Sequence, residues 1–124
     1  MNTRLPSQLL LLDHETLEDL ALLEAARPGL VIDLARKFET ARVVQLEQLR
    51  ASLAAGDSAA AALLLHSLRG GSAALGMQGL AAAFDQLEAR LPAGIEHIDE
   101  LFELMKQSVA ALRAQFILPP TLLP

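Results

Sequence analysis

The chain has 124 residues, a net charge of −5 and no cysteine, and 52% of its residues are hydrophobic but only 3% are aromatic. This length suits one compact domain, and the lack of cysteine excludes disulfides, thiolate chemistry and zinc–sulfur sites. The negative charge argues against nucleic acid as a partner, because phosphate binding needs a basic face. Alanine and leucine dominate the sequence, and both are strong helix formers, so we expect an all-α fold.

The N-terminal half predicts two helices. Asp13 can cap a short helix that runs to about Ala26, and Pro28-Gly29 ends it. A long helix follows from about Leu30 to Ala55, because its hydrophobic residues recur at spacings of three and four. The leucine-rich segment before Asp13 is too short to span a bilayer and shows no signal-peptide pattern, so we expect a soluble, cytoplasmic protein with no membrane partner.

The C-terminal half predicts three more helices. Gly56-Asp57 indicates a helix stop followed by a new N-cap, and the third helix then covers about 58–75. Gly76 interrupts this helix. Hydrophobic stripes over 80–91 and 98–116 predict the last two helices.

Together these elements predict an antiparallel four-helix bundle with a short additional N-terminal helix. The predicted bundle covers 13–116, between an N-terminal tail at 1–12 and a proline-rich C-terminal tail at 117–124. The short connections favour a monomer, although the same stripes would also serve a helical oligomer. The initial methionine and the compact length favour a free-standing protein.

The third helix contains the most unusual stretch, LLLHSLRGGSAALG at 63–76. On a helical wheel one narrow sector holds four residues, with Ala61 beside them, and we predict that this sector is buried. The four are Leu64, Leu68, Gly71 and Leu75. His66 lies opposite, so its imidazole is predicted to face solvent. Its neighbours on that side are small or cationic: Ala59, Ala62, Arg69, Gly70 and Ala73.

The two consecutive glycines then have separate explanations. Each costs about 1 kcal/mol of helix stability relative to alanine, so a compensating reason is expected. Gly71 lies in the predicted core sector, where a missing side chain lets a neighbouring helix approach closely. Gly70 leaves room beside the imidazole. Alternatively, the helix ends near Arg69 and the glycines form a loop, but Leu75 returns on the same stripe and argues against this.

An exposed neutral imidazole is a good nucleophile for an acyl or phosphoryl group that a partner brings. No acidic residue in sequence reach orients His66, so a hydrolytic triad is not expected. Arg69, three residues later, can offset the charge of a phosphoryl group. The plain alternative is a solvated surface histidine, which is also our interpretation of His14 and His97. The three histidines lack the spacing of a metal site, and none is predicted.

The segment HSLRGGSAALG resembles the signature of histidine phosphotransfer (HPt) domains, H-x-L-K-G-S-S/A-x-x-L-G. Six residues fall on matching positions: His66, Leu68, Gly70, Ser72, Leu75 and Gly76. Arg69 keeps the charge of the usual lysine, whereas Gly71 departs from the usual serine or alanine. The resemblance spans about 13–116, and Leu87-Glu88 also resembles a family feature.

This resemblance implies a phosphocarrier of two-component signalling rather than an enzyme. His66 would accept a phosphoryl group from an aspartate of one receiver domain and pass it to another, and the implied partners are response-regulator receivers and a hybrid sensor histidine kinase. The receiver would supply Mg²⁺, and no cofactor is expected on this chain. Arg69 would assist electrostatically, Gly70 would give clearance, and Gln78 would hydrogen-bond near the imidazole. The small residues Ala59, Ala62 and Ala73 would complete the partner-binding surface.

Two other functions stay open. The chain could be a helical interaction module that binds a receiver or another signalling protein without accepting phosphate, although the histidine and the nearby cation argue against this. It could also be the dimerisation domain of a histidine kinase, but the residue after the histidine is then usually acidic, and here it is Ser67. The chain is too short to hold an ATP-binding kinase domain as well.

Overall fold

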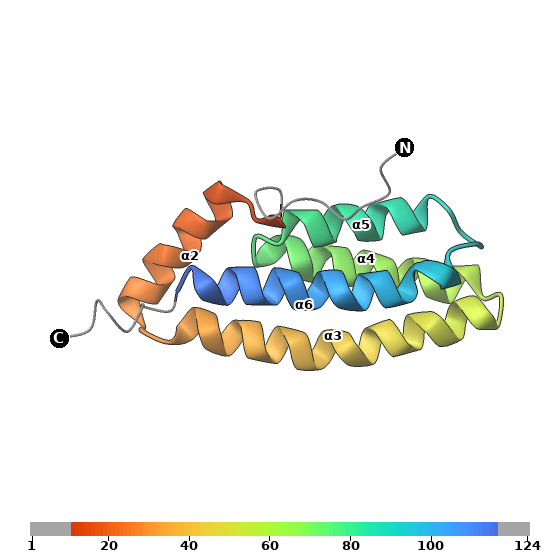
Figure 1. Cartoon of the computed structure of the whole chain (residues 1–124), viewed down its shortest axis with the longest axis horizontal. Helices are drawn as coiled ribbons and strands as arrows, with labels where there is room; N and C mark the ends of the chain where they lie inside the picture. The colour runs from red at the N-terminus through yellow and green to blue at the C-terminus, as the bar shows by residue number, and fades with distance from the viewer. Residues whose placement is uncertain (1–10, 117–124) are drawn as a thin grey trace.

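The computed structural model describes residues 11–116, and within this range the chain is helical with no strand. The helices are α2 (His14–Ala26), α3 (Leu30–Ala54), α4 (Ser58–Ala74), α5 (Gln78–Glu88) and α6 (Ile98–Ala114), with a short 3₁₀ helix, η1 (Ile95–His97), before α6. The four helices α3 to α6 run along one another, and the shorter α2 lies at one end of this bundle (Figure 1). The predicted all-α fold is therefore confirmed.

Both predicted acidic N-caps are present. The Asp13 carboxylate accepts hydrogen bonds from the backbone N–H and the hydroxyl of Thr16, at 3.3 and 2.6 Å. Asp57 accepts a hydrogen bond of 3.0 Å from the backbone N–H of Ala60. These bonds satisfy N–H groups that have no partner within the first turn of a helix, so they fix where α2 and α4 begin.

The turn between α4 and α5 depends on a glycine. Gly76 has a φ of +75°, a conformation that side chains rarely adopt, and a Cβ atom there would lie 3.3 Å from Thr16. The N–H of Met77 donates to the carbonyl of Ser72 at 2.9 Å, which closes the end of α4 in a Schellman motif. The carbonyl of Gly76 accepts a 2.8 Å hydrogen bond from the N–H of Asp13. The predicted interruption at Gly76 is thus a tight turn that also holds the start of α2.

One helix end differs from its prediction. The stripe over 80–91 predicted a helix as far as Leu91, but α5 ends at Glu88. Leu91 still packs against the core from the following turn. A proline at 92 explains the early end, because proline disfavours a helical conformation in the residue before it.

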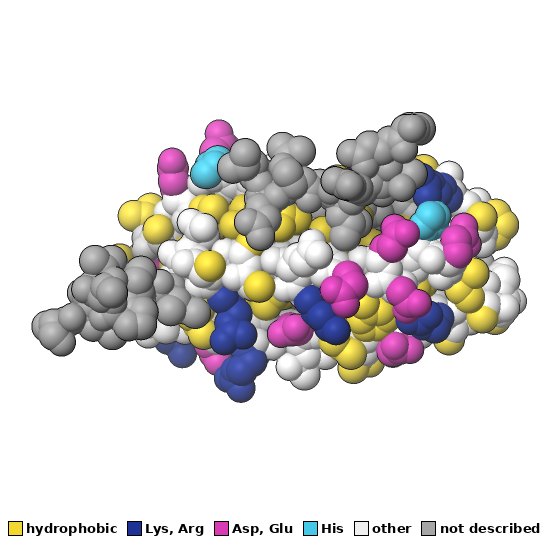
Figure 2. All heavy atoms as spheres, viewed as in Figure 1, with side chains coloured by type: hydrophobic (Ala, Val, Ile, Leu, Met, Phe, Trp, Pro, Cys, Tyr) yellow, Lys and Arg dark blue, Asp and Glu magenta, His cyan; other side chains and the backbone are white. Residues whose placement is uncertain are grey.

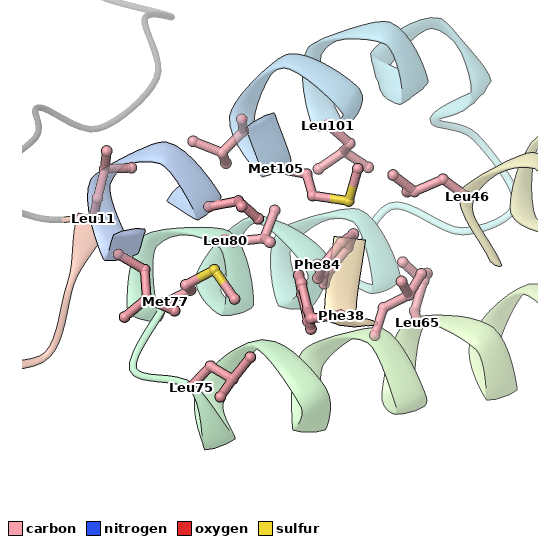
Figure 3. Close-up of a cluster of buried hydrophobic side chains, with 14 of the residues drawn as sticks. Leu11, Phe38, Leu46, Leu65, Leu75, Met77, Leu80, Phe84, Leu101 and Met105 are labelled. Carbon is pink, nitrogen blue, oxygen red and sulfur yellow. The ribbon is translucent and has the colours of Figure 1, made fainter. Parts of the chain in front are cut away.

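The core fills the space between the long helices. In Figure 3, Phe38 of α3 and Phe84 of α5 point into the same cluster as Leu65 of α4 and Met105 of α6. Two buried hydroxyls, of Ser72 and Ser108, each donate a 2.7 Å hydrogen bond to the backbone carbonyl four residues earlier. Neither is therefore an unsatisfied polar group in the core.

The predicted tails lie mostly outside the described residues, which begin at 11 and end at 116. Leu11 and Leu12 are the exception. They were assigned to the N-terminal tail, yet they are buried in the core cluster with only 1% and 8% of their surface exposed.

Acidic and basic side chains are interspersed on the side of the bundle formed by α3 and α6 (Figure 2). The Arg50 guanidinium donates to the Asp99 carboxylate at 2.9 Å and so links α3 to α6. Glu47 is a second partner of Arg50, and Lys106 pairs with Glu103 along α6. We refer to these five residues as the charged face. Within residues 11–116, no helix has the length and hydropathy needed to cross a bilayer.

Candidate functional site

Helix α4 has a buried side that differs in part from the predicted one. Its buried residues are Ala61, Leu65, Leu68 and Ser72, and Leu75 follows at the helix end. Leu64 and Gly71, which were predicted to be buried, are only half-buried. The reason is that α4 packs against α5 as well as α3, so the buried arc is centred between these two neighbours and Leu64 lies at its edge.

His66 lies on the opposite side of α4 and is exposed, as the helical wheel predicted. Its imidazole makes no hydrogen bond to any side chain or backbone group of residues 11–116. A nucleophilic nitrogen in this position is open to a partner without first breaking an internal contact.

The surface around His66 consists of small or hydrophobic residues. We define the histidine face as Ala59, Ala62, Leu63, His66, Gly70 and Ala73. A Cβ atom added at Gly70 would meet nothing within 4 Å, which agrees with the predicted clearance. Among the predicted members, Ala62 is half-buried and the others are exposed. None of the other five residues of the histidine face carries a charge.

Leu63 is the member that sequence reasoning missed. Its surface is 75% exposed, and it adds a large hydrophobic side chain to the small residues near the imidazole. It precedes His66 by three residues and therefore lies on the same side of the helix. That spacing was the available signal, but a leucine in a hydrophobic run is expected to be buried.

Arg69 lies at the edge of the histidine face, toward α5. Its Nε atom is 3.2 Å from the Asp85 carboxylate, and 39% of its side chain is exposed. The predicted cation is therefore present beside His66, but it already has a carboxylate partner on the next helix. Because exposed ion pairs are weak, the guanidinium can leave Asp85 at little cost.

The same ion pair shows the register of α4 against the antiparallel α5. Three residues back from Arg69 along α4 is His66, and three residues forward from Asp85 along α5 is Glu88. Residues three apart on a helix share a face, so the exposed Glu88 of α5 lies level with His66 along the two helices. Sequence reasoning had noted Glu88 only as a family feature and had not assigned it to the site.

Gln78 does not have the predicted position. It is the first residue of α5, and its Nε2 atom donates a 2.9 Å hydrogen bond to the carbonyl of Leu12. The opposite end of α5, at Glu88, is the one that is level with His66, and ten residues of helix separate the two ends by about 15 Å. Gln78 therefore fixes the N-terminal segment and does not reach the imidazole.

On the other side of α4, polar side chains cross to α3. Gln45 donates from Nε2 to the Ser67 hydroxyl at 3.1 Å, and Arg42 donates to the Gln45 side-chain oxygen. A Cβ atom at Gly71 would lie 2.9 Å from Nη2 of Arg42. Gly71 thus permits a close approach from the neighbouring helix, as predicted. The approaching group, however, is an arginine side chain at the edge of the interface, not a helix backbone in the core.

The two other histidines lie elsewhere. His14 is exposed in the first turn of α2, as predicted. His97 was also predicted to be solvated, but it is half-buried, because Arg90 donates to its Nε2 atom at 2.9 Å and Glu100 lies 3.7 Å from its ring. Within residues 11–116 no group of three or more histidine or acidic side chains is arranged to hold a metal ion.

These observations agree with the comparison to known families. The family model of the Hpt domain matches residues 13–115, which is most of the chain. No curated protein and no solved structure matched. Hpt domains are phosphoryl carriers rather than enzymes, and they act in phosphorelays by interacting with receiver domains. The chain, an all-helical bundle with an exposed histidine inside the matched region, therefore belongs to the Hpt domain family.

Proposed function

We propose that His66 is the phosphoacceptor, and that this chain carries a phosphoryl group as a monomer between two receiver domains. The donor is a phosphorylated aspartate on the receiver of a hybrid sensor histidine kinase, and the acceptor is an aspartate on a response regulator. The observation that carries this proposal is the exposed imidazole in the middle of α4, which lies among the small or hydrophobic residues of the histidine face with Arg69 at its edge. His97 lacks such surroundings, since it contacts an arginine and two carboxylates. His14 is exposed, but it lies in the first turn of α2 beside the acidic Glu15.

The transfer needs only one nucleophilic atom from this chain. A ring nitrogen of His66 attacks the phosphorus, a P–N bond forms, and the P–O bond to the aspartate carboxylate breaks. The ring proton on the other nitrogen is lost to solvent, which reaches the exposed imidazole. In the second transfer, the ring takes a proton back from solvent, an aspartate carboxylate of the next receiver attacks the phosphorus, and the P–N bond breaks to release the neutral imidazole. Mg²⁺ would be held by the receiver, where it would offset the charge of the phosphoryl group.

Residues around His66 support this chemistry in different ways. Arg69 can leave the exposed Asp85 and pair with the phosphoryl oxygens. Glu88, level with the imidazole, can accept a hydrogen bond from the ring N–H and so orient the other nitrogen toward the phosphorus. The small residues of the histidine face let a second protein approach the ring closely.

The test is a transfer reaction with isolated receiver domains. Each candidate receiver is phosphorylated with radioactive phosphate and mixed with the chain in the presence of Mg²⁺. The expected result is a label on this chain that is acid-labile and alkali-stable, as phosphohistidine is, and that disappears when a second receiver is added. His66→Gln should abolish the label, while the matched control His97→Gln should retain it. A receiver that binds the chain but never labels it would instead indicate a non-phosphorylating interaction module.

A further inference from the structure

Next to the histidine face, a pocket of about 310 Å³ lies in the seam between α3 and α4. Its hydrophobic lining comes from Leu34 and Phe38 on α3 and from Ala74 and Leu75 on α4. Gly71 lines it on the side of α4 that faces α3, and Ala74 connects it to the histidine face because it directly follows Ala73. A protein that covers the imidazole is therefore close enough to reach this pocket.

The same pocket holds a cation whose charge is not neutralised. In residues 11–116, Arg36, Arg50 and Arg69 each pair with a carboxylate, whereas Arg42 has none within 4.0 Å. Arg27, Arg90 and Arg113 in this range also lack a carboxylate partner, but they are exposed to solvent, while Arg42 is half-buried. The Arg42 guanidinium lies 5.2 Å from the centre of the Phe38 ring, and its only hydrogen bond in this range goes from Nη1 to Gln45. Its Nε atom is buried without a partner.

A partly buried arginine with an unsatisfied nitrogen and no counter-ion is energetically unfavourable, so this arrangement suggests a ligand that pairs with it. The glycine at 71 makes this arrangement possible. A Cβ atom there would come within 2.9 Å of Nη2 and force the guanidinium to move. The remaining side of Arg42, at Nη2, makes no hydrogen bond to residues 11–116 and is the side next to Gly71.

We propose that this pocket anchors the receiver domain that docks on His66, by taking up a hydrophobic side chain that lies next to a carboxylate. The hydrophobic group packs against Leu34 and Phe38, and the carboxylate pairs with Arg42. Lys37 adds a second positive charge at the pocket, although it also contacts Asp33 at 3.1 Å. Positive charge in a hydrophobic pocket is complementary to an acidic and hydrophobic partner, and such pairing contributes to the choice of partner. The inference rests on the proposed function, because the receiver is the occupant.

The experiment uses a receiver domain that labels the chain in the transfer assay. Its dissociation constant is measured by titration calorimetry at two salt concentrations, with four versions of the full chain. Arg42→Gln removes the charge, Ala74→Leu fills the pocket without changing charge, and Arg36→Gln is a matched control on the same helix. We expect Arg42→Gln and Ala74→Leu each to weaken binding about tenfold, and Arg42→Gln also to reduce the salt dependence. In transfer kinetics, Arg42→Gln should raise the receiver concentration for half-maximal rate more than it lowers the maximal rate.

The outcomes separate the anchor from the proposed function. Thermal melts first establish that each variant is folded. If Arg42→Gln does not fold, Ala74→Leu still tests the pocket. If Arg42→Gln and Ala74→Leu bind the receiver as tightly as Arg36→Gln, while the chain is still labelled, the anchor is wrong and the phosphocarrier function stands. If no receiver labels the chain, the proposed function fails, and the anchor fails with it because its occupant was the receiver.

Discussion

The histidine face and the charged face are both exposed helix surfaces of the same bundle, yet they differ in what satisfies their side chains. On the charged face, Arg50 and Asp99 neutralise each other across two helices. On the histidine face, the imidazole of His66 and the hydrophobic surface of Leu63 have no partner within residues 11–116. The side chains of the charged face are thus paired within the chain, while the histidine face is free to contact the receiver domain of the proposed function.

According to the proposed function, the side chains that stabilise the fold and those that take part in transfer lie on different faces of this small domain. Single hydrophobic residues on a protein surface are common and need no explanation. Here, however, the exposed leucine lies one turn from a nucleophile and from a glycine that leaves open space. Changes on the histidine face should therefore affect transfer more than stability, and changes on the charged face should not affect transfer.

The largest effect is expected for a side chain added at Gly70. Gly70→Leu should lower the rate of transfer from a receiver by at least about tenfold, because a leucine there projects beside the imidazole where two proteins must approach. Stability should stay the same or rise by up to about 1 kcal/mol, since leucine is a better helix former than glycine. Transfer assays and thermal melts measure the two effects.

The control is Ala110→Leu, which adds a side chain on the exposed surface of α6 and should transfer normally. Normal transfer by Gly70→Leu would show that Gly70 is not needed for clearance.

The neighbouring glycine should respond in the opposite way. Gly71→Leu should lower the free energy of unfolding by about 1–3 kcal/mol, because its side chain must displace the Arg42 guanidinium from the interface between α3 and α4. Urea denaturation of Gly70→Leu and Gly71→Leu in parallel measures the contrast. Equal stabilities would mean that the two glycines do not have different structural roles.

A smaller effect is expected for two arginines that each pair with a carboxylate on another helix. Arg69→Ala should slow transfer several-fold, because it removes a positive charge beside the phosphoryl group while the receiver still supplies the main electrostatic stabilisation. Arg50→Ala removes the corresponding cation from the charged face and should leave the transfer rate unchanged. Single-turnover rates of both variants provide the comparison. If Arg69→Ala transfers as fast as Arg50→Ala, Arg69 is only a surface residue.

The smallest effect concerns the junction of α2 and α3, away from both faces. Glu24 accepts hydrogen bonds from the backbone N–H groups of Gly29 and Val31, at 2.6 and 2.9 Å, and these hold its pKa below the ordinary value of 4.5. Its contribution to stability is therefore complete above pH 4.5 and is lost as the pH falls through the lower folded-state pKa. Glu24→Gln should be slightly less stable at neutral pH and should lose less stability on acidification. Thermal melts of the two proteins from neutral pH to below pH 4.5 measure this difference. An unchanged pH dependence in Glu24→Gln would contradict the role of Glu24.

Much of the fold was predictable because helix signals are local. The capping carboxylates of Asp13 and Asp57, and the glycine at 76, each act within a few residues of where they occur. The exposure of His66 followed from the helical period alone. In contrast, the period does not show how many neighbours a helix has, and for that reason Leu64 and Gly71 were predicted to be more deeply buried than they are.

The rest of the site depends on contacts between helices, which no local pattern contains. Arg69 meets Asp85 only because the turn at Gly76 brings α5 back along α4, and the position of Glu88 follows from that contact. Gln78 was misassigned for the same reason, since its partner is a carbonyl 66 positions earlier in the chain. Leu63 was missed because a leucine in a hydrophobic run is expected to be buried, and only the arrangement of α3, α4 and α5 leaves it exposed.

The central claim is that His66, alone among the three histidines, carries the phosphoryl group. The most direct measurement is mass spectrometry of the chain after transfer from a phosphorylated receiver, with digestion kept at alkaline pH so that phosphohistidine survives. The account predicts one phosphoryl group, on the peptide that contains His66. A phosphoryl group on the peptide of His14 or His97 would contradict it, as would a phosphorylated chain in which His66 is unmodified.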